Sequence, residues 1–203
     1  MTPSSPVRLV PVDSEIDTVR AASAVEELLR AFGRDVDDEH LLDTPRRVVE
    51  SLVELLEPRP FTMTTFPNDE GYHELVLVRG IPFTSLCRHH LLPFRGVAHV
   101  GYLPGERIVG LSKLARVVDW FARDLQVQER LTMQIAEHLE AALSPRGVGV
   151  VLSAEHLCMS ARGIRAQGAA TVTSAFTGAV AHDPGLRARF IHSAHEEESW
   201  RIS

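Results

Sequence analysis

The sequence predicts an α+β fold in which antiparallel hairpins flank a pair of helices. The first observation is the order of the hydrophobic patterns along the chain, which reads helix, helix, strands, helix, helix, strands, helix. The second is that turn signals such as Pro104-Gly105 join the segments that alternate polar and apolar residues, which is typical of hairpins. With 203 residues, of which 44% are hydrophobic and 24% charged, the chain is large enough for one globular domain plus an appendage.

The N-terminal part predicts a flexible end followed by a helical segment, residues 17–60. Residues 1–16 are rich in Pro and Ser and are expected to be flexible. Over residues 17–32, apolar side chains recur at helical spacing, and Gly33 is a plausible C-cap. A second helix is expected to start at Thr44-Pro45, with Thr44 as N-cap, to bury a stripe of Val and Leu side chains, and to end at Pro58. Residues 59–71 read as a connecting loop.

The main domain is expected over residues 70–203. Residues 73–79 and 96–103 alternate polar and apolar side chains as strands do, and Ile108-Val109 reads as the return strand after the turn. The later elements are helices over residues 112–125 and 127–143, strands over 148–152 and 171–176, and a short helix after Asp183-Pro184.

Charge and composition exclude several classes of partner. The formal net charge is −6, from 21 basic and 27 acidic residues, and an acidic chain is a poor candidate for binding long nucleic acid. The sequence has no apolar run near the roughly 18–20 residues that a membrane-spanning helix needs. Its start, MTPSSPVRLV, lacks the basic and apolar regions of a secretory signal. We therefore expect a cytoplasmic protein that binds neither nucleic acid nor a membrane.

Both cysteines of the chain stand beside histidines, in Cys87-Arg88-His89-His90 and His156-Leu157-Cys158. Cys87 and His90 are separated by the reach of a tight turn, and His156 and Cys158 are expected to share one face of a strand. Three such ligands with a free fourth position would make a catalytic zinc site. The spacing equally allows a closed structural Cys2His2 site, and buried cysteines without a metal are a third reading.

Two further segments could bind a phosphorylated purine. Ser112 is expected to be the N-cap of a helix that also carries Lys113 and Arg116, and helix N-termini favour phosphate. Glu129, at the start of the next helix, could accept two hydrogen bonds from the N1–H and 2-amino group of guanine. Taken alone, both segments are more typical of solvated helix starts.

Six blocks taken together resemble the GTP cyclohydrolase I family, over about residues 44–190. The blocks are TPRR (44–47), SLCRHHLLPF (85–94), GLSKLAR (110–116), QVQERLT (126–132), EHLCMSARG (155–163) and TVTS (171–174). The resemblance implies the tunnelling fold, an antiparallel sheet with two helices packed on one face. It also implies a homodecamer of two stacked pentamers with active sites between subunits.

The resemblance assigns a role to each matching position. The metal ligands would be Cys87, His90 and Cys158, holding one Zn²⁺ per subunit. His89 and His156 would transfer protons, and Ser112 would lie near the ribose and phosphates. Guanine would be held by Glu129 with help from Gln128, and the triphosphate by Lys113, Arg116, Arg162 and, at its distal end, Arg47. Arg88 departs from the family, which usually has an acid between the Cys and the first His.

The implied reaction is hydrolytic opening of the GTP imidazole ring at C8, with His156 protonating N7. Loss of formate and rearrangement of the ribose would then give 7,8-dihydroneopterin triphosphate, the first step of folate and pterin biosynthesis. Two alternatives stay open: a paralogue that stops at the formamide or serves a deazapurine pathway, and a non-catalytic purine- or pterin-binding module with structural zinc. The presence of both His89 and His156 argues against the binding module, which needs no proton-transfer pair.

Overall fold

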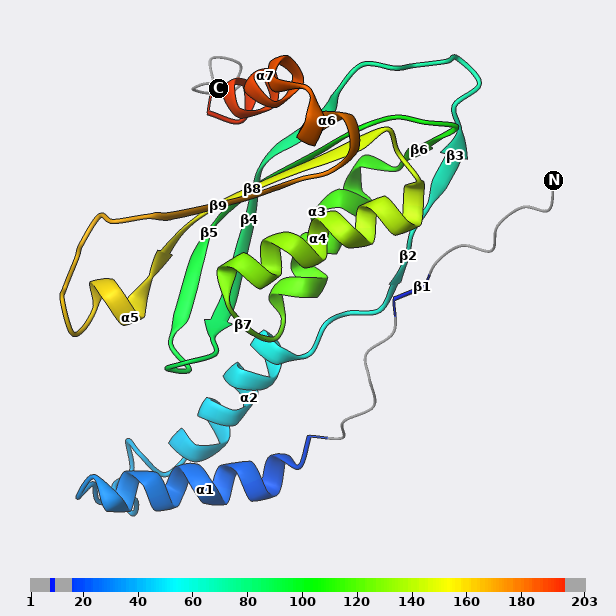
Figure 1. The fold of residues 1–203 in the computed structure, drawn as a ribbon. Coiled ribbons are helices and arrows are strands. Elements are labelled where there is room, and N and C mark those ends of the chain that lie inside the picture. Colours follow the sequence, from blue (N-terminus) through cyan, green and yellow to red (C-terminus); the bar gives the residue numbers. More distant parts are fainter. Residues whose placement is uncertain (1–7, 10–15, 196–203) are drawn as a thin grey trace, which may run out of the picture.

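The structure, a computed structural model, describes residues 8–9 and 16–195. Most of the predicted flexible segment, residues 1–16, lies outside the described residues, as does the acidic run Glu196–Glu198. In Figure 1 a long sheet carries helices on both faces, and a separate pair of helices extends from one end of the sheet.

The main sheet has five strands in the order β7-β4-β5-β8-β9. Its three central strands are β4 (Val76–Cys87), β5 (Pro93–Leu103) and β8 (Gly147–His156). They are antiparallel to their neighbours, as is β9 (Thr171–Phe176), whereas the short β7 (Leu125–Gln126) runs parallel to β4. The predicted antiparallel sheet is therefore confirmed.

The helices α3 (Leu111–Ala122) and α4 (Gln128–Leu143) cover one face of this sheet. Alternate residues of β8 point toward them, because successive side chains of a strand face opposite ways. Val148, Val150 and Leu152 are fully buried there against Leu114, Leu131 and other apolar side chains of the two helices. This core is the one that the tunnelling fold implies, with a helical pair on a single face of the sheet.

A second, smaller core lies on the other face, under α6 (Gly178–His182) and α7 (Pro184–His195). Its centre is Phe190, which is fully buried. The ring lies over Gly101 and Gly149, which are directly opposite each other on β5 and β8. A Cβ at Gly149 would meet Cε2 of Phe190 at 2.6 Å, and one at Gly101 would meet the same atom at 3.0 Å. Two glycines thus make the space that seats α7 on the sheet.

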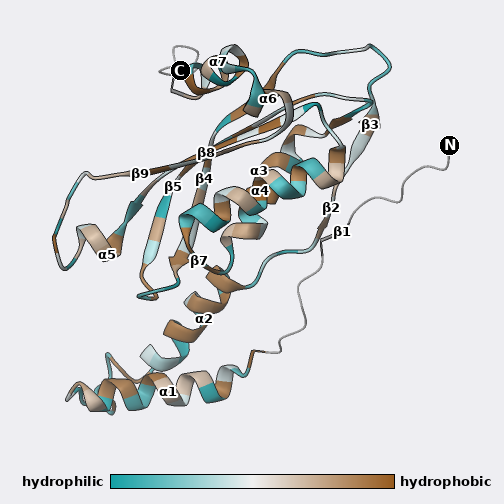
Figure 2. Cartoon of the chain, in the orientation of Figure 1, coloured by the Kyte–Doolittle hydropathy of each residue, from teal (hydrophilic) through white to brown (hydrophobic). Residues whose placement is uncertain are grey.

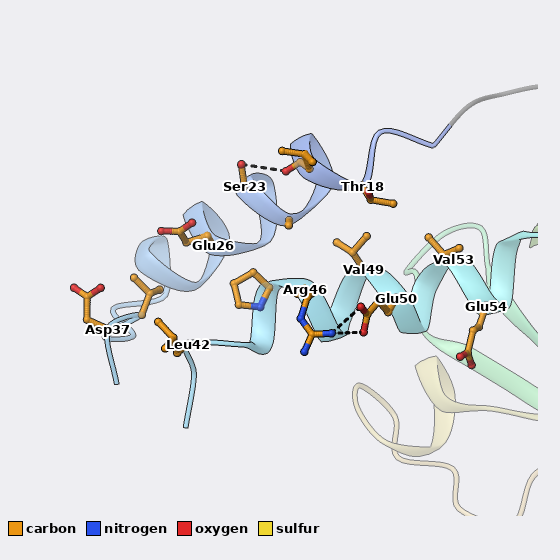
Figure 3. Close-up of a pocket in the computed structure, with 14 residues that line it drawn as sticks. Thr18, Ser23, Glu26, Asp37, Leu42, Arg46, Val49, Glu50, Val53 and Glu54 are labelled. Carbon is orange, nitrogen blue, oxygen red and sulfur yellow. Dashed lines mark hydrogen bonds and ion pairs between the residues drawn. The ribbon is translucent and has the colours of Figure 1, made fainter. Parts of the chain in front are cut away.

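The N-terminal helices α1 (Thr18–Ala31) and α2 (Thr44–Leu56) project from the end of the sheet (Figure 1). Figure 2 shows apolar residues along both helices, yet α1 has no buried residue, and Val49 is the one buried residue of α2. The predicted buried stripe on α2 is therefore wrong for the single chain. An open groove of about 860 Å³ separates the two helices, and in Figure 3 Val49 and Val53 lie on the side of α2 that faces α1.

The predicted loop over residues 59–71 contains strands instead. β2 (Phe61–Thr62) pairs with β1 (Arg8–Leu9), and β3 (Thr65–Pro67) pairs with β6 (Arg107–Val109). The strand expected to return along the hairpin therefore joins β3 rather than β5. Short strands of this kind are hard to predict because pairing with a distant segment, not local pattern, forms them. None of the helices over the described residues has the length and apolar character to cross a bilayer.

The Phe190 contact predicts a non-additive pair of substitutions. Gly149→Ala places a methyl group where the ring lies, so we expect a loss of about 1–3 kcal/mol in the free energy of unfolding. Phe190→Ala removes the fully buried ring, at a cost of about 3–5 kcal/mol. In the double variant the methyl no longer meets a ring, and the total loss should be smaller than the sum. Urea unfolding of the four proteins measures this, and strictly additive losses would contradict the contact.

Candidate metal centre and active site

The first two candidate ligands come from the tight turn between β4 and β5. β4 ends at Cys87, whose carbonyl accepts hydrogen bonds from the backbone N–H groups of His90 and Leu91. The Cys87 N–H donates to the carbonyl of Leu92, which closes the turn. Leu91 adopts φ 55°, a conformation uncommon for a residue with a side chain. The turn brings Nδ1 of His90 to 3.7 Å from Sγ of Cys87.

The third candidate ligand, Cys158, lies just beyond β8. The prediction that His156 and Cys158 share a strand face is wrong, because β8 ends at His156 and Cys158 belongs to the short helix α5 (Leu157–Ser160). Because the chain changes from strand to helix between them, the two side chains contact different residues. His156 contacts Phe94 and Gln128, whereas Cys158 contacts Cys87. The ligand atoms of Cys158, Cys87 and His90 all lie within 4.8 Å of one another.

These three donors suit a metal ion. Burial raises the pKa of the Cys158 thiol, and the neighbouring Cys87 raises it further, so the Cys158 thiol is not easily ionised in the absence of a cation. A cation between them removes that cost, since thiolates are the form that binds metal. Two sulfurs and one imidazole nitrogen are a donor set that zinc accepts, with a fourth position for a non-protein ligand.

His156 stands beside this donor cluster and is held by two contacts. Its ring stacks on Phe94, with centroids 4.6 Å apart and planes within 2°. Its Nε2 lies 2.7 Å from Oε1 of Gln128, at the start of α4. Burial lowers the pKa of His156, and the carboxylate of Glu129 partly opposes that effect. The imidazole is thus fixed in orientation beside an acidic group.

The other candidate residues near the donors are exposed. His89 lies next to His90, with ring centroids 6.3 Å apart. The positive charge of Arg162 slightly opposes the effects that raise the pKa of Cys158, so this guanidinium acts electrostatically on the donors. Arg88 is exposed, and its backbone N–H donates to the carbonyl of Gln126 on β7. The backbone of Arg88 therefore links the turn to β7, and its side chain, which differs from the acid usual in the family, faces solvent.

The candidate phosphate-binding residues lie at the far end of α3. Gly110, not Ser112, is the N-cap, and Ser112 is an exposed residue of the first turn. The Nζ of Lys113 lies 6.0 Å from the ring centroid of Phe61. α3 runs from β6 toward β7, which pairs with Cys87 at the end of β4. Its 12 residues make a helix about 18 Å long, at about 1.5 Å per residue, so its start lies at the end of the helix away from the donors.

Arg116 is exposed on α3, and Arg47 forms an ion pair of 3.1 Å with Asp43 on α2. Within one chain, the structure thus brings the candidate ligands together with His156 and Glu129, but not with the start of α3.

Sequence reasoning did not single out three residues near His156, although all three lie in the quoted blocks. Phe94 ends the block SLCRHHLLPF, Thr132 ends QVQERLT, and Thr173 is the third residue of TVTS. Phe94 stacks on His156, while the two threonine hydroxyls lie 2.6 Å apart beside Gln128. Their positions within the blocks were the only available signal, because an apolar ring and two hydroxyls match no chemical motif by themselves.

Comparisons with known proteins show the family of the chain. The family model described as GTP cyclohydrolase I matches residues 21–195. The chain is 55% identical over 179 residues to GTP cyclohydrolase 1 of Streptomyces griseus, covering 85% of this chain and 88% of the relative. It is 54% identical over 179 residues to that of Mycolicibacterium gilvum, covering 86% and 89%.

A solved structure of the archaeosine synthase QueF-Like in the apo form gives a TM-score of 0.44 at 20% identity, covering 52% of this chain and 95% of that one. A likeness this low has no bearing on the site. The family match and the identity to the two curated relatives lead to one conclusion: the chain belongs to the GTP cyclohydrolase I family.

Proposed function

We propose that Cys87, His90 and Cys158 hold one zinc ion per chain and that this site opens the imidazole ring of GTP. The chain is a hydrolase with the activity of its family: it opens GTP at C8, releases formate and yields 7,8-dihydroneopterin triphosphate. The observation that supports the metal most directly is the meeting of two sulfurs and one imidazole nitrogen within 4.8 Å. When bound, zinc supplies a Lewis acid that makes water nucleophilic near neutral pH.

His156 is the proposed proton donor to N7 of the guanine ring. Its ring is held by Phe94 and Gln128 beside the donor cluster, so its position is set before substrate arrives. Pre-set orientation of this kind supplies part of the rate of an enzyme. His89, exposed next to His90, is the proposed second proton-transferring group.

Glu129 is the proposed anchor for guanine. It stands in the first turn of α4, is exposed, and acts electrostatically on His156. A carboxylate has two oxygens that can accept from the N1–H and the 2-amino group of one base edge. Held in this way, the purine would present C8 and N7 to the donor cluster and to His156.

The triphosphate needs cations, and the chain offers them in two places. Arg162 acts electrostatically on Cys158, whereas Lys113 and Arg116, together with the Ser112 hydroxyl, lie in the first half of α3, which begins away from the donors. A neighbouring subunit would bring the start of its own α3 to the donors. We therefore propose active sites between the subunits of a homo-oligomer, a homodecamer as the family implies, with Arg47 as a distal phosphate contact.

The exposed apolar residues on the N-terminal helices suit such an assembly. Val19 and Phe32 are 78% and 69% exposed in the single chain. Packing between subunits would remove this surface from water. Both cysteines are free thiols, and a pair that must stay reduced to bind metal suits the cytoplasm, where we place the protein.

The wild-type protein loaded with zinc tests the function directly. On incubation with GTP we expect formate and the absorbance of a dihydropterin. Accumulation of a formamide without formate would indicate a paralogue that stops early. Binding of GTP without turnover would indicate a binding module, and either result would reject the proposed function.

Substitution of Cys158 tests the metal site. Cys158→Ala should lose zinc and abolish formate production, because two remaining ligands hold zinc poorly. Met159→Ala is the matched control: it is the next residue of α5, it is exposed, and it should keep one zinc per chain. Zinc content is measured by elemental analysis, and full turnover by metal-free Cys158→Ala would refute the site.

Substitution of His156 separates proton transfer from metal binding. His156→Ala should keep its zinc yet lose about 10²–10⁴-fold in kcat, the usual contribution of general acid–base catalysis. Zinc content and the single-turnover rate of formate release are measured on the same sample. An unchanged rate would remove His156 from the mechanism.

Substitution of Glu129 tests guanine recognition. Glu129→Gln keeps the shape but replaces one acceptor oxygen by a donor, so the KM for GTP should rise and the preference for GTP over ATP should fall. Glu137→Gln, at an exposed position two turns further along α4, is the matched control and should change neither value. Undiminished preference for GTP in Glu129→Gln would reject the assignment.

A further inference from the structure

A buried polar cluster surrounds Gln128, and the reaction described above uses only one of its contacts, the one with His156. Gln128 and Thr132, one turn apart on α4, are 2% and 1% exposed. Their side chains meet Thr173, which lies across from them on β9. Buried polar groups are costly unless each is hydrogen-bonded, so the arrangement of these bonds is informative.

The orientation of the Gln128 amide is fixed by two backbone carbonyls. Its Nε2 lies 2.9 Å from the carbonyl oxygen of Thr171 and 3.3 Å from that of Leu152. A carbonyl can only accept, so the side-chain nitrogen must point toward these two atoms. The opposite orientation would put Oε1 against two oxygens. Oε1 must therefore face His156, as it does at 2.7 Å.

The two threonine hydroxyls fit the same orientation. The Thr132 hydroxyl donates its single hydrogen to the backbone carbonyl of Gln128, at 2.7 Å. The 2.6 Å contact between Thr132 and Thr173 must then use the hydrogen of Thr173. This leaves the Thr173 oxygen as an acceptor for Nε2 of Gln128, at 3.1 Å. Each hydroxyl hydrogen thus has one acceptor, and the two hydrogens of Nε2 are shared among three acceptors, all of which require the same orientation of the amide.

We propose that Gln128, locked by Thr132 and Thr173, is a positioning residue that holds His156 with its proton on Nε2. Oε1 of Gln128 can only accept, so Nε2 of His156 must donate to it. Nδ1 is then the ring nitrogen left for substrate, because no residue in the described part of the chain forms a hydrogen bond with it. Nδ1 carries no proton at rest, so in the proposed reaction it first takes a proton from the water that attacks C8 and then gives that proton to N7. The assignment rests on the proposed role of His156 in the reaction.

This proposal replaces the expectation that the Gln128 side chain helps to anchor guanine. Its amide nitrogen and oxygen are both engaged by protein groups. Glu129, the next residue, is exposed and stays the guanine anchor. Two neighbouring residues of α4 thus have different roles: Gln128 orients His156, and Glu129 binds the base.

The resting enzyme gives the first test, without any turnover. In zinc-loaded protein labelled with ¹⁵N-histidine, the neutral His156 ring should show a protonated Nε2 and an unprotonated Nδ1 by solid-state NMR. The His156 signals are identified by their absence from His156→Ala. A resting ring with its proton on Nδ1 would overturn the proposal. Failure of GTP turnover would refute the proposed function, but it would not change what this spectrum says about the position of the proton on His156.

Kinetics of Gln128→Leu give the second test. An orienting partner of this kind is worth about 10–100-fold in activity. The single-turnover rate should fall by that factor while zinc content and the dissociation constant for GTP stay unchanged. A guanine contact would give the reverse result, with weaker GTP binding at an unchanged rate, and would overturn the proposal.

The threonines supply a pair of variants that keep the core filled. Thr132→Val keeps nearly the same side-chain size but cannot form the hydrogen bonds to Gln128 and Thr173. The single-turnover rate should therefore fall, and the Nε2 proton signal of His156 should broaden. Thr132→Ser keeps the hydroxyl and should restore both values relative to Thr132→Val. Equal rates and equal spectra in the two variants would show that the hydroxyl does not act through Gln128, and would overturn the part of the proposal that concerns Thr132.

Discussion

The candidate site depends on the register of β5 between its two long neighbours. Phe94 of β5 pairs with Ser85 of β4 on one side and with His156 of β8 on the other. Cys87 and Cys158 each follow one of these partners by two residues, so both sulfurs lie at the same end of the sheet. A slip of one residue would turn the fully buried Phe94 to the opposite face, at the expense of the core. The packing of the core thereby fixes the distance between the donors.

The helices α3 and α4 run along the sheet from one end to the other. α4 begins beside the donors and places Gln128 and Glu129 there, whereas α3 begins at the opposite end with Lys113. One chain therefore holds the candidate metal ligands and the proposed phosphate-binding residues in two separate places. This separation is the physical reason why we propose active sites shared between subunits: the start of α3 of one chain would add Lys113 and Arg116 to the Arg162 of another chain.

The sequence predicted the sheet and the helical pair because long apolar patterns dominate their formation, as in α4. The Cys87 and His90 spacing also pointed to a shared turn. Other features depended on contacts between distant segments. Cys158 follows the end of β8, so the expected strand face was interrupted by a helix. The hydrogen bonds of Gln128 to β9 form only when distant segments meet, so its place in the sequence could not show them. Local pattern could identify such residues but not their partners.

The central claim is that two sulfurs and one imidazole hold an ion with one position left open. X-ray absorption spectroscopy at the zinc edge of the loaded, resting protein tests it most directly. The account predicts two sulfur ligands, one imidazole nitrogen and one light atom from solvent, with the solvent ligand exchanging when a substrate analogue is added. A second imidazole in the fourth position, or fewer than two sulfurs, would contradict it.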